Sequence, residues 1–190
     1  MTINNILVVG VGGQGTLITS RILGNLAMSL GHDVKLSEVH GMAQRGGSVV
    51  THIRYGEKVY SPLVEIGQAD IIVSFEKLEA LRWKHFLRED GIMLVNTQEI
   101  DPMPVIIGTS TYPEDIILKL EEECKNVISI DALSRAKELG NIKVANTVLL
   151  GLLAKNMSIP KENWIEIIKT TVPEKTIEIN VAAFESGYTA

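Results

Sequence analysis

Apolar residues near the amino terminus change from a short continuous run to a helical spacing. The run Ile6-Leu7-Val8-Val9 predicts a buried strand over residues 3–9. A short polar segment follows, and beyond it the apolar residues recur every three or four positions, as on one face of a helix. They are Leu17, Ile18, Ile22, Leu23 and Leu26. This spacing predicts a helix over residues 16–30, which Gly31 ends.

The rest of the apolar pattern predicts further strands that alternate with helices. Residues 48–54 alternate in polarity, and a turn at 55–58 leads to Val59 and Tyr60, so a β-hairpin is expected there. The other expected strands cover residues 33–37, 69–75, 91–96, 105–108 and 127–130, and the other expected helices cover residues 77–87, 113–124, 146–154, 161–171 and 174–184. Glu76 and Glu79 near the start of one helix suit capping of that helix better than catalysis.

This order of elements predicts an α/β fold in a single domain. We expect a three-layer, Rossmann-like, mostly parallel sheet with a β-hairpin insertion and a helix-rich C-terminal third. The chain of 190 residues is 45% hydrophobic, which suffices for one core. It contains neither a linker nor a repeat, so residues 1–190 are expected to form one domain.

Composition excludes several classes of function. The net charge is −5 and no basic stripe with interleaved aromatic residues occurs, so nucleic acid is not an expected partner. The apolar runs are strand-sized, far from the roughly 20 residues of a membrane helix. The first residues lack the features of a signal peptide, so the expected location is cytoplasmic. One cysteine, Cys124, and four histidines without ligand spacing predict neither a disulfide nor a metal site.

The first candidate site is the glycine-rich turn between the first strand and the first helix. Its sequence is Gly10-Val11-Gly12-Gly13-Gln14-Gly15, followed by Thr16 at the start of the helix. In this context Gly10 allows a tight turn, Gly12 lets a ligand approach the backbone, and Gly15 lets the helix pack close to the strand. The helix amino terminus then offers N–H groups to a phosphate, pyrophosphate or carboxylate. The alternative is a tight turn that binds nothing.

A second glycine-rich segment follows the expected second strand. It runs over residues 38–47 and supplies His40, Gln44, Arg45, Gly46 and Gly47. Arg45 could clamp a phosphate or carboxylate, and His40 could donate or accept a proton near neutral pH. Ligands bind at the carboxyl ends of strands in open α/β sheets, so we expect a joint site with the first turn. The alternative is a flexible surface loop with a solvated arginine.

Together, the two segments resemble the gamma-type domain of the 2-oxoacid:ferredoxin oxidoreductases. The sequence motif over residues 40–47, His-Gly-Met-Ala-Gln-Arg-Gly-Gly, is most similar to the small beta subunit of indolepyruvate ferredoxin oxidoreductase. Gly67-Gln68-Ala69-Asp70 and Asn180 ahead of Ala183-Phe184-Glu185 add to the likeness, which therefore extends along nearly the whole chain.

The resemblance implies a subunit that is inactive alone. The family oxidatively decarboxylates a 2-oxoacid, transfers the acyl group to coenzyme A and passes electrons to ferredoxin. This chain has no thiamine signature and no set of cysteines for a cluster, so it should carry no cofactor and no catalytic residue of its own. A large alpha subunit would hold thiamine diphosphate and the iron–sulfur clusters, and ferredoxin would be reached through the complex. A homodimer of the isolated chain is compatible with this picture.

The two segments have two roles under this resemblance. Residues 12–16 and Arg45 could bind coenzyme A as co-substrate, with His40 or Gln44 facing the substrate carboxylate or the cofactor. Alternatively, both segments fold against the large subunit and touch no ligand.

Two other functions stay open at this stage. One is a stand-alone dehydrogenase that binds NAD(P) or a flavin, suggested by the glycine turn and by Glu38 at the end of the second strand, where an acidic residue would hold a ribose. The other is a non-catalytic nucleotide-binding module. Titration with NADH separates the first of these from a subunit of a larger complex.

Overall fold

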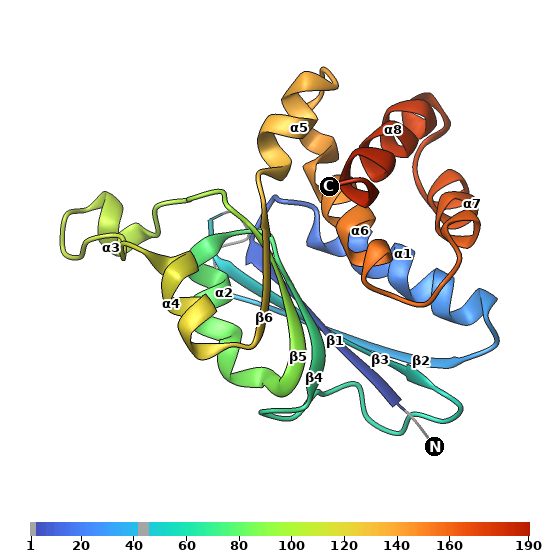
Figure 1. The fold of residues 1–190 in the computed structure, drawn as a ribbon, viewed down its shortest axis with the longest axis horizontal. Helices are drawn as coiled ribbons and strands as arrows, with labels where there is room; N and C mark the ends of the chain where they lie inside the picture. Colours follow the sequence, from blue (N-terminus) through green and yellow to red (C-terminus); the bar gives the residue numbers. More distant parts are fainter. Residues whose placement is uncertain (1–2, 42–45) are drawn as a thin grey trace.

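A six-stranded sheet forms the centre of the protein (Figure 1), as described by a computed structural model that covers residues 3–41 and 46–190. The strand order is β2-β3-β1-β4-β5-β6. The strands are β1 (Ile3–Val11), β2 (Asp33–His40), β3 (Ser48–Gly56), β4 (Ala69–Ser74), β5 (Leu87–Asn96) and β6 (Asn126–Ile130).

The strands on the two sides of β1 pair differently. On one side β1 pairs parallel with β4, followed by the parallel pairs β4–β5 and β5–β6. On the other side β3 pairs antiparallel with both β1 and β2. The chain leaves β1 toward β2 and β3 and later returns to β4, so the topological switch point lies between β1 and β4. Open α/β sheets bind ligands outside the carboxyl ends of the strands at such a point.

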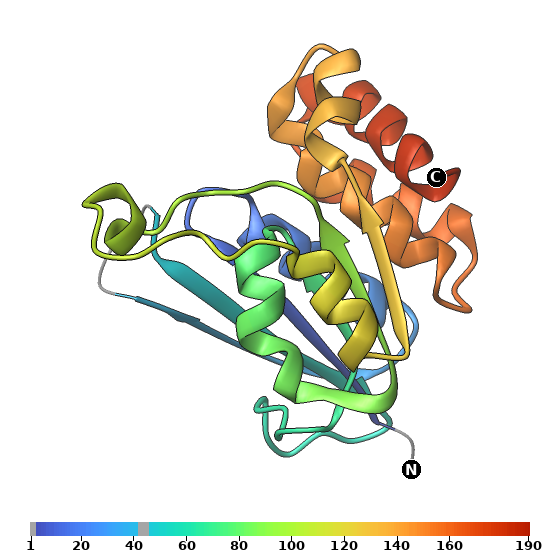
Figure 2. The ribbon, with the colours of Figure 1, turned by 60° about the vertical axis from the view of Figure 1, so that its left-hand side comes forward.

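Helices cover both faces of the sheet, which gives three layers (Figures 1 and 2). On one face α2 packs on β1, β4 and β5, with α4 beside it. On the other face α1 packs on β1, β2 and β3, with α6 and α7 against it. The helices are α1 (Thr16–Ser29), α2 (Lys77–Trp83), α3 (Met103–Ile106), α4 (Ile116–Glu123), α5 (Ala132–Glu138), α6 (Ala145–Lys155), α7 (Lys161–Thr171) and α8 (Ile177–Tyr188), with 3-10 turns at Lys84–Phe86, Ile142–Val144 and Glu174–Thr176.

The alternating side chains of β1 supply both halves of the core. Ile6 and Val8 face the half that contains α1 and the C-terminal helices. Leu7 and Val9 face the half under α2 and α4. Both faces of a mostly parallel sheet are covered in this fold, which explains why the strand reads as a continuous apolar run.

Two glycines permit the closest helix contact in the C-terminal third. A Cβ atom added at Gly151 of α6 would overlap the backbone carbonyl oxygen of Phe184 in α8. A Cβ atom at Gly187 of α8 would overlap the carbonyl oxygen of Val148 in α6. The backbones of the two helices therefore touch directly, as small residues at a crossing allow.

The predicted fold class and the helix-rich C-terminal third are confirmed, but several boundaries differ. Residues 59–60 do not form a strand, and the hairpin consists of β2 and β3 instead. Val59 donates its N–H to the Asp33 carboxylate at 3.0 Å rather than to a strand partner. The second strand also continues to His40 instead of ending at residue 37.

The expected strand at 105–108 is also wrong. Residues of this run belong to α3, which begins after Pro102 and has Pro104 in its first turn. Proline fits the first turn of a helix because it lacks the N–H that would have no helical partner there. The helix expected from residue 113 begins only at Ile116.

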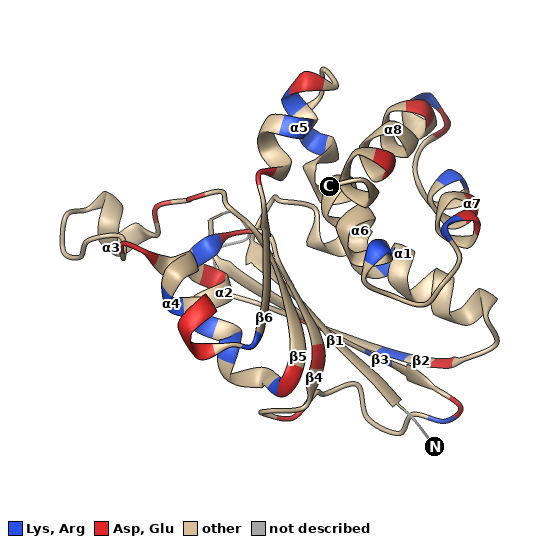
Figure 3. Cartoon of the chain, in the orientation of Figure 1, with Lys and Arg blue, Asp and Glu red and all other residues tan. Residues whose placement is uncertain are grey.

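Charges of both signs are interspersed on the helices. Figure 3 shows basic and acidic residues together on α4, α5 and α7. Within residues 3–41 and 46–190, no helix combines the length and the hydropathy that a membrane span needs.

Candidate functional site

The glycine-rich turn connects β1 to α1 in a conformation that only glycine adopts readily. Gly13 has φ of 104° and Gly15 has φ of 92°, both in the left-handed region. The first backbone bond of α1 runs from the N–H of Thr19 to the carbonyl of Gly15 at 3.2 Å. The N–H groups of Thr16, Leu17 and Ile18 therefore have no helical partner, and within residues 3–41 and 46–190 no side chain caps this end. An anion could be bound here.

Gln14 stabilises this turn from inside. Its side-chain oxygen accepts the N–H of Val11 at 2.8 Å. Its amide nitrogen donates to the carbonyl of Phe75 at 2.9 Å and to Oε1 of Gln98 at 3.1 Å. The side chain thus ties the end of β1 to the segments that follow β4 and β5. Its polar atoms are engaged within the protein, so Gln14 supports the turn, and its predicted role in ligand binding stays a prediction.

Gly10 fits its predicted role, whereas Gly15 does not. A Cβ atom at Gly10 would lie 2.9 Å from Oε1 of Gln14 in the turn and 2.9 Å from Cβ of Phe75 directly after β4, so Gly10 permits close packing at the turn. A Cβ atom at Gly15 would lie 3.0 Å from Nδ2 of Asn146 in α6. Gly15 therefore allows close approach of α6, and not of the first strand.

The backbone joins the two glycine-rich segments directly. The N–H of Gly12 donates to the carbonyl of Gly47 at 2.9 Å, and the N–H of Gly46 donates to the carbonyl of Gly12 at 3.4 Å. The structure therefore brings the two predicted segments together. Gly12 uses its own N–H in this contact, and the unpaired donors belong to the start of α1 instead. Gln44 and Arg45 lie outside the described residues, and their predicted roles stay predictions.

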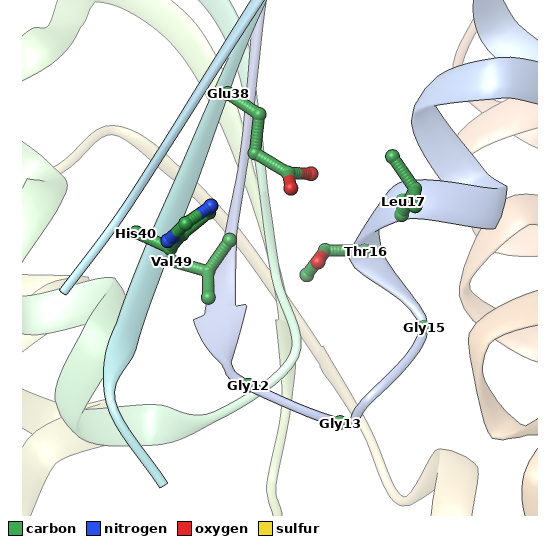
Figure 4. Close-up of a pocket in the computed structure, with 8 residues that line it drawn as sticks. All are labelled: Gly12, Gly13, Gly15, Thr16, Leu17, Glu38, His40 and Val49. Carbon is green, nitrogen blue, oxygen red and sulfur yellow. The ribbon is translucent and has the colours of Figure 1, made fainter. Parts of the chain in front are cut away.

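A cavity of about 420 Å³ lies between these segments. Figure 4 shows Glu38 and His40 of β2 on one side and Thr16 and Leu17 of α1 on the other. Gly12, Gly13, Gly15 and Val49 complete its lining. His40 and Glu38 are both exposed, and the hydroxyl of Thr51 donates to the Glu38 carboxylate at 3.2 Å.

This cavity combines groups that suit different parts of a nucleotide. The unpaired N–H groups of α1 fit a phosphate, whereas the Glu38 carboxylate accepts hydrogen bonds and fits the hydroxyl groups of a ribose. The arrangement differs from that of NAD-binding folds, because β3 lies between β1 and β2. Glu38 is thus two strand spacings, about 9.6 Å, away from β1. This offset does not favour the dehydrogenase alternative.

A buried carboxylate holds the end of the second segment. Glu79 of α2 is 3% exposed and accepts a short hydrogen bond from the hydroxyl of Ser48, the first residue of β3. Arg82 approaches the same carboxylate at 3.5 Å. Burial raises the pKa of Glu79 above its ordinary value of 4.5, although Ser48 and Arg82 oppose the shift.

We expect this raised pKa to make stability depend on pH. The folded state holds a proton on Glu79 more tightly than the unfolded state, so stability is fully present below about pH 4.5 and decreases as the pH rises through the raised pKa. Replacing Glu79 by Gln should remove this decrease. Urea unfolding between pH 4 and 8 measures it, with Glu121→Gln, an exposed glutamate of α4, as control. Equal pH dependence of wild type and Glu79→Gln would show that the pKa is not raised.

Comparison with known proteins identifies the family of this chain. A model of the pyruvate ferredoxin/flavodoxin oxidoreductase family matches residues 5–190, which is nearly the whole chain. The chain belongs to this family. One relative, indolepyruvate oxidoreductase subunit IorB of Thermococcus kodakarensis, is 43% identical over 191 aligned positions, with coverage of 98% of this chain and 95% of the relative. The predicted resemblance and the assignment to an oxidoreductase subunit are confirmed.

Solved structures of the family share the fold. The gamma subunit of a keto/oxoacid ferredoxin oxidoreductase from Geobacter sulfurreducens aligns with a TM-score of 0.73 at 23% identity and covers 98% of this chain and 96% of its own. The 2-oxoglutarate:ferredoxin oxidoreductase of Magnetococcus marinus aligns with a TM-score of 0.69 at 18% identity. This chain corresponds to 31% of that larger protein. The same fold thus occurs as a separate subunit and within a longer chain.

The metal prediction receives no direct test. Among residues 3–41 and 46–190, no three side chains of the His, Cys, Asp and Glu types are grouped so that they could hold a metal ion. Asn146 is a site neighbour that the sequence did not reveal, because it lies 131 positions beyond the glycine that it contacts.

Proposed function

We propose that this chain is the small subunit of an indolepyruvate-type oxidoreductase that forms an acyl-coenzyme A from an aryl 2-oxoacid. The identity of 43% to an indolepyruvate oxidoreductase subunit, over nearly the full length of both chains, carries the proposal. A large partner subunit holds thiamine diphosphate and the iron–sulfur clusters and passes electrons to ferredoxin. The complex works in the cytoplasm.

The residues of this chain suit binding rather than bond breaking. The sequence has a single cysteine, so the chain cannot hold an iron–sulfur cluster alone. The start of α1 offers unpaired N–H groups for a phosphate of coenzyme A, which supplies the thiol that accepts the acyl group. Glu38 and His40 lie across the same cavity and could hold hydroxyl groups. We assign the chain a role in positioning coenzyme A and in completing the site of the partner.

Production of the chain with and without a large partner tests this function. The partner would be the product of a neighbouring gene that has several cysteine motifs. We expect the purified complex to reduce a viologen dye when given indolepyruvate and coenzyme A, and the single chain to show no reduction. Omission of coenzyme A should prevent acyl-coenzyme A formation.

Two controls make the outcome specific. Pyruvate in place of indolepyruvate tests whether the substrate is aromatic, and NADH titrated into the single chain tests the dehydrogenase alternative. A single chain that oxidises a substrate with NAD would contradict the proposal. A complex that forms but accepts no 2-oxoacid would also contradict it.

A further inference from the structure

A second cavity lies on the other side of the glycine-rich turn. It has a volume of about 380 Å³ and shares Gly13 and Gly15 with the first cavity. Its remaining wall comes from α1, from the segments after β4 and β5, and from the region where α5 leads into α6. The carboxyl ends of β1 and β4 meet here, so this cavity lies at the topological switch point of the sheet.

Three side chains offer hydrogen-bond donors to this cavity. They are Gln98 after β5, Lys143 before α6 and Asn146 in the first turn of α6. Within the described part of the chain, the side-chain nitrogen of each donates to no partner. Asn146 is only 6% exposed, and its Nδ2 lies against Gly15 in the cavity wall. Its nitrogen is accessible at the cavity rather than fully enclosed, so a ligand or water can accept its hydrogen bond.

The oxygen atoms of the Gln98 and Asn146 amides have their contacts with other groups of the protein. Oε1 of Gln98 already accepts from Gln14 at 3.1 Å, which leaves its nitrogen free. Oδ1 of Asn146 has only a 3.3 Å contact with the hydroxyl of Thr147, which donates to Asn180 at 2.7 Å instead. The cavity therefore presents hydrogen-bond donors, and a molecule bound there has to supply hydrogen-bond acceptors.

A helix amino terminus adds to this preference. The start of α1 has N–H groups without a helical partner directly after Gly15, which lines this cavity. The 3-10 turn before α6 offers no such groups, because the backbone N–H of Lys143 donates to Oδ1 of Asn141 at 3.0 Å and that of Val144 donates to the carbonyl of Asn141 at 3.1 Å. The positive end of the α1 dipole favours an anion. Among the described residues, no aspartate or glutamate lines this cavity, whereas Glu38 lines the first one.

Another part of the wall is apolar, and the amides of Gln14 and Asn96, which also line the cavity, are engaged within the protein. Ile18, Phe75 and Leu133 line it, so the bound molecule has an apolar part next to its acceptor groups. We propose that this second cavity binds the anionic end of a small organic acid or phosphate ester that has an apolar body. Gln98, Lys143 and Asn146 are its binding residues. Under the proposed function, on which the choice of ligands rests, coenzyme A and the aryl 2-oxoacid both have this chemistry.

Substitutions that keep the shape of the cavity test this site. Asn146→Asp is isosteric and places a negative charge where the anion would lie. Lys143→Met removes the positive charge from an exposed position. Lys137→Met, an exposed lysine of α5 that lines neither cavity, is the matched control. All are measured in the complex with the large subunit, as the KM for coenzyme A and for indolepyruvate.

We expect Asn146→Asp and Lys143→Met to raise one of the two KM values about tenfold or more, the size expected for a lost charge-assisted hydrogen bond. The value of kcat should change much less, and Lys137→Met should resemble wild type. A change in the KM for coenzyme A identifies phosphate as the bound group, and a change in that for indolepyruvate identifies the carboxylate. Unchanged KM values for both ligands in an active complex would overturn the site while leaving the proposed function intact.

Direct binding separates the two proposals further. If no active complex forms, the full-length single chain is titrated by calorimetry with coenzyme A, with inorganic pyrophosphate and with indolepyruvate. Binding that Asn146→Asp abolishes and Lys137→Met preserves supports the site independently of the function. No binding of any of the three to the wild-type chain, or equal binding to Asn146→Asp, overturns it.

Discussion

Replacing Gly187 by Ala should destabilise the protein by about 3 kcal/mol or more, because the added methyl group cannot fit between α6 and α8. It would overlap the carbonyl oxygen of Val148, which belongs to the rigid backbone of a buried helix. The two helices would have to separate, and α6 also packs on α1 and β5. Gly151→Ala should have an effect of the same size for the reciprocal reason.

Urea unfolding of the full chain, followed by circular dichroism, measures this loss. Gly24→Ala in α1 is the matched control, since it is also a helical glycine. Its new methyl group would meet only the end of the flexible Leu36 side chain, at 3.0 Å. Alanine favours a helix over glycine by about 1 kcal/mol, so Gly24→Ala should leave stability equal or higher. A Gly187→Ala variant with the midpoint of wild type would show that the two helices are further apart than described.

A second large loss of stability is expected when Glu76 is replaced by Ala. This carboxylate is 1% exposed and accepts three hydrogen bonds. One comes from the N–H of Glu79 at 2.9 Å, one from the N–H of Ile100 at 3.2 Å, and a short one from the hydroxyl of Tyr112. Without the carboxylate, buried donors lose their partner, and we expect a cost of about 3 kcal/mol.

The effect should be local as well as global. Glu76 attaches the start of α2 to the segment of residues 97–115 at Ile100 and Tyr112, so amide exchange at Ile100 should become faster in Glu76→Ala. Glu76→Gln keeps one acceptor and should have an intermediate effect. Tyr112→Phe removes a single donor, and the double variant Glu76→Gln/Tyr112→Phe gives the coupling energy. Additive effects of the two single changes would mean that the hydroxyl and the carboxylate do not interact.

Glu76 also shows what a sequence can reveal of a residue and what it cannot. Its position before an apolar helical pattern predicted a capping role, and its side chain does accept the N–H of Glu79. The contacts with Ile100 and Tyr112 depend on how a later segment returns to α2. They leave no local pattern in the sequence.

The edge strand β2 was predicted too short for a related reason. Residues 38–40 are exposed, and Val39 is a single apolar residue between the polar Glu38 and His40. They therefore lack the apolar pattern that predicts a strand. Their extended form comes from backbone pairing with β3, in which Glu38 is opposite Thr51 and His40 is opposite Val49. The apolar run at 105–108 predicted a strand that the structure does not contain. Ile106 and Ile107 of this run are more than 60% exposed, so their apolar character does not reflect burial in a sheet.

The candidate site was predictable only in part. The strand–turn–helix context of Gly10 to Thr16 located the turn, and the polarity of residues 38–47 located the second segment beside it. The inward orientation of Gln14 and the approach of Asn146 to Gly15 could not be predicted, because each depends on packing between elements far apart in the chain.

The packing of late helices on α1 has a consequence for the nascent chain during synthesis. Ile22, Leu23 and Leu26 of α1 are almost completely buried, and the helices packed against α1, which include α6 and α7, come more than a hundred residues later. A ribosome adds roughly 5–20 residues per second, so the part of the α1 surface that these helices cover, as opposed to the part that packs on β1, β2 and β3, stays uncovered for on the order of ten seconds during synthesis. The nascent chain therefore presents a binding surface for chaperones until its last helices emerge.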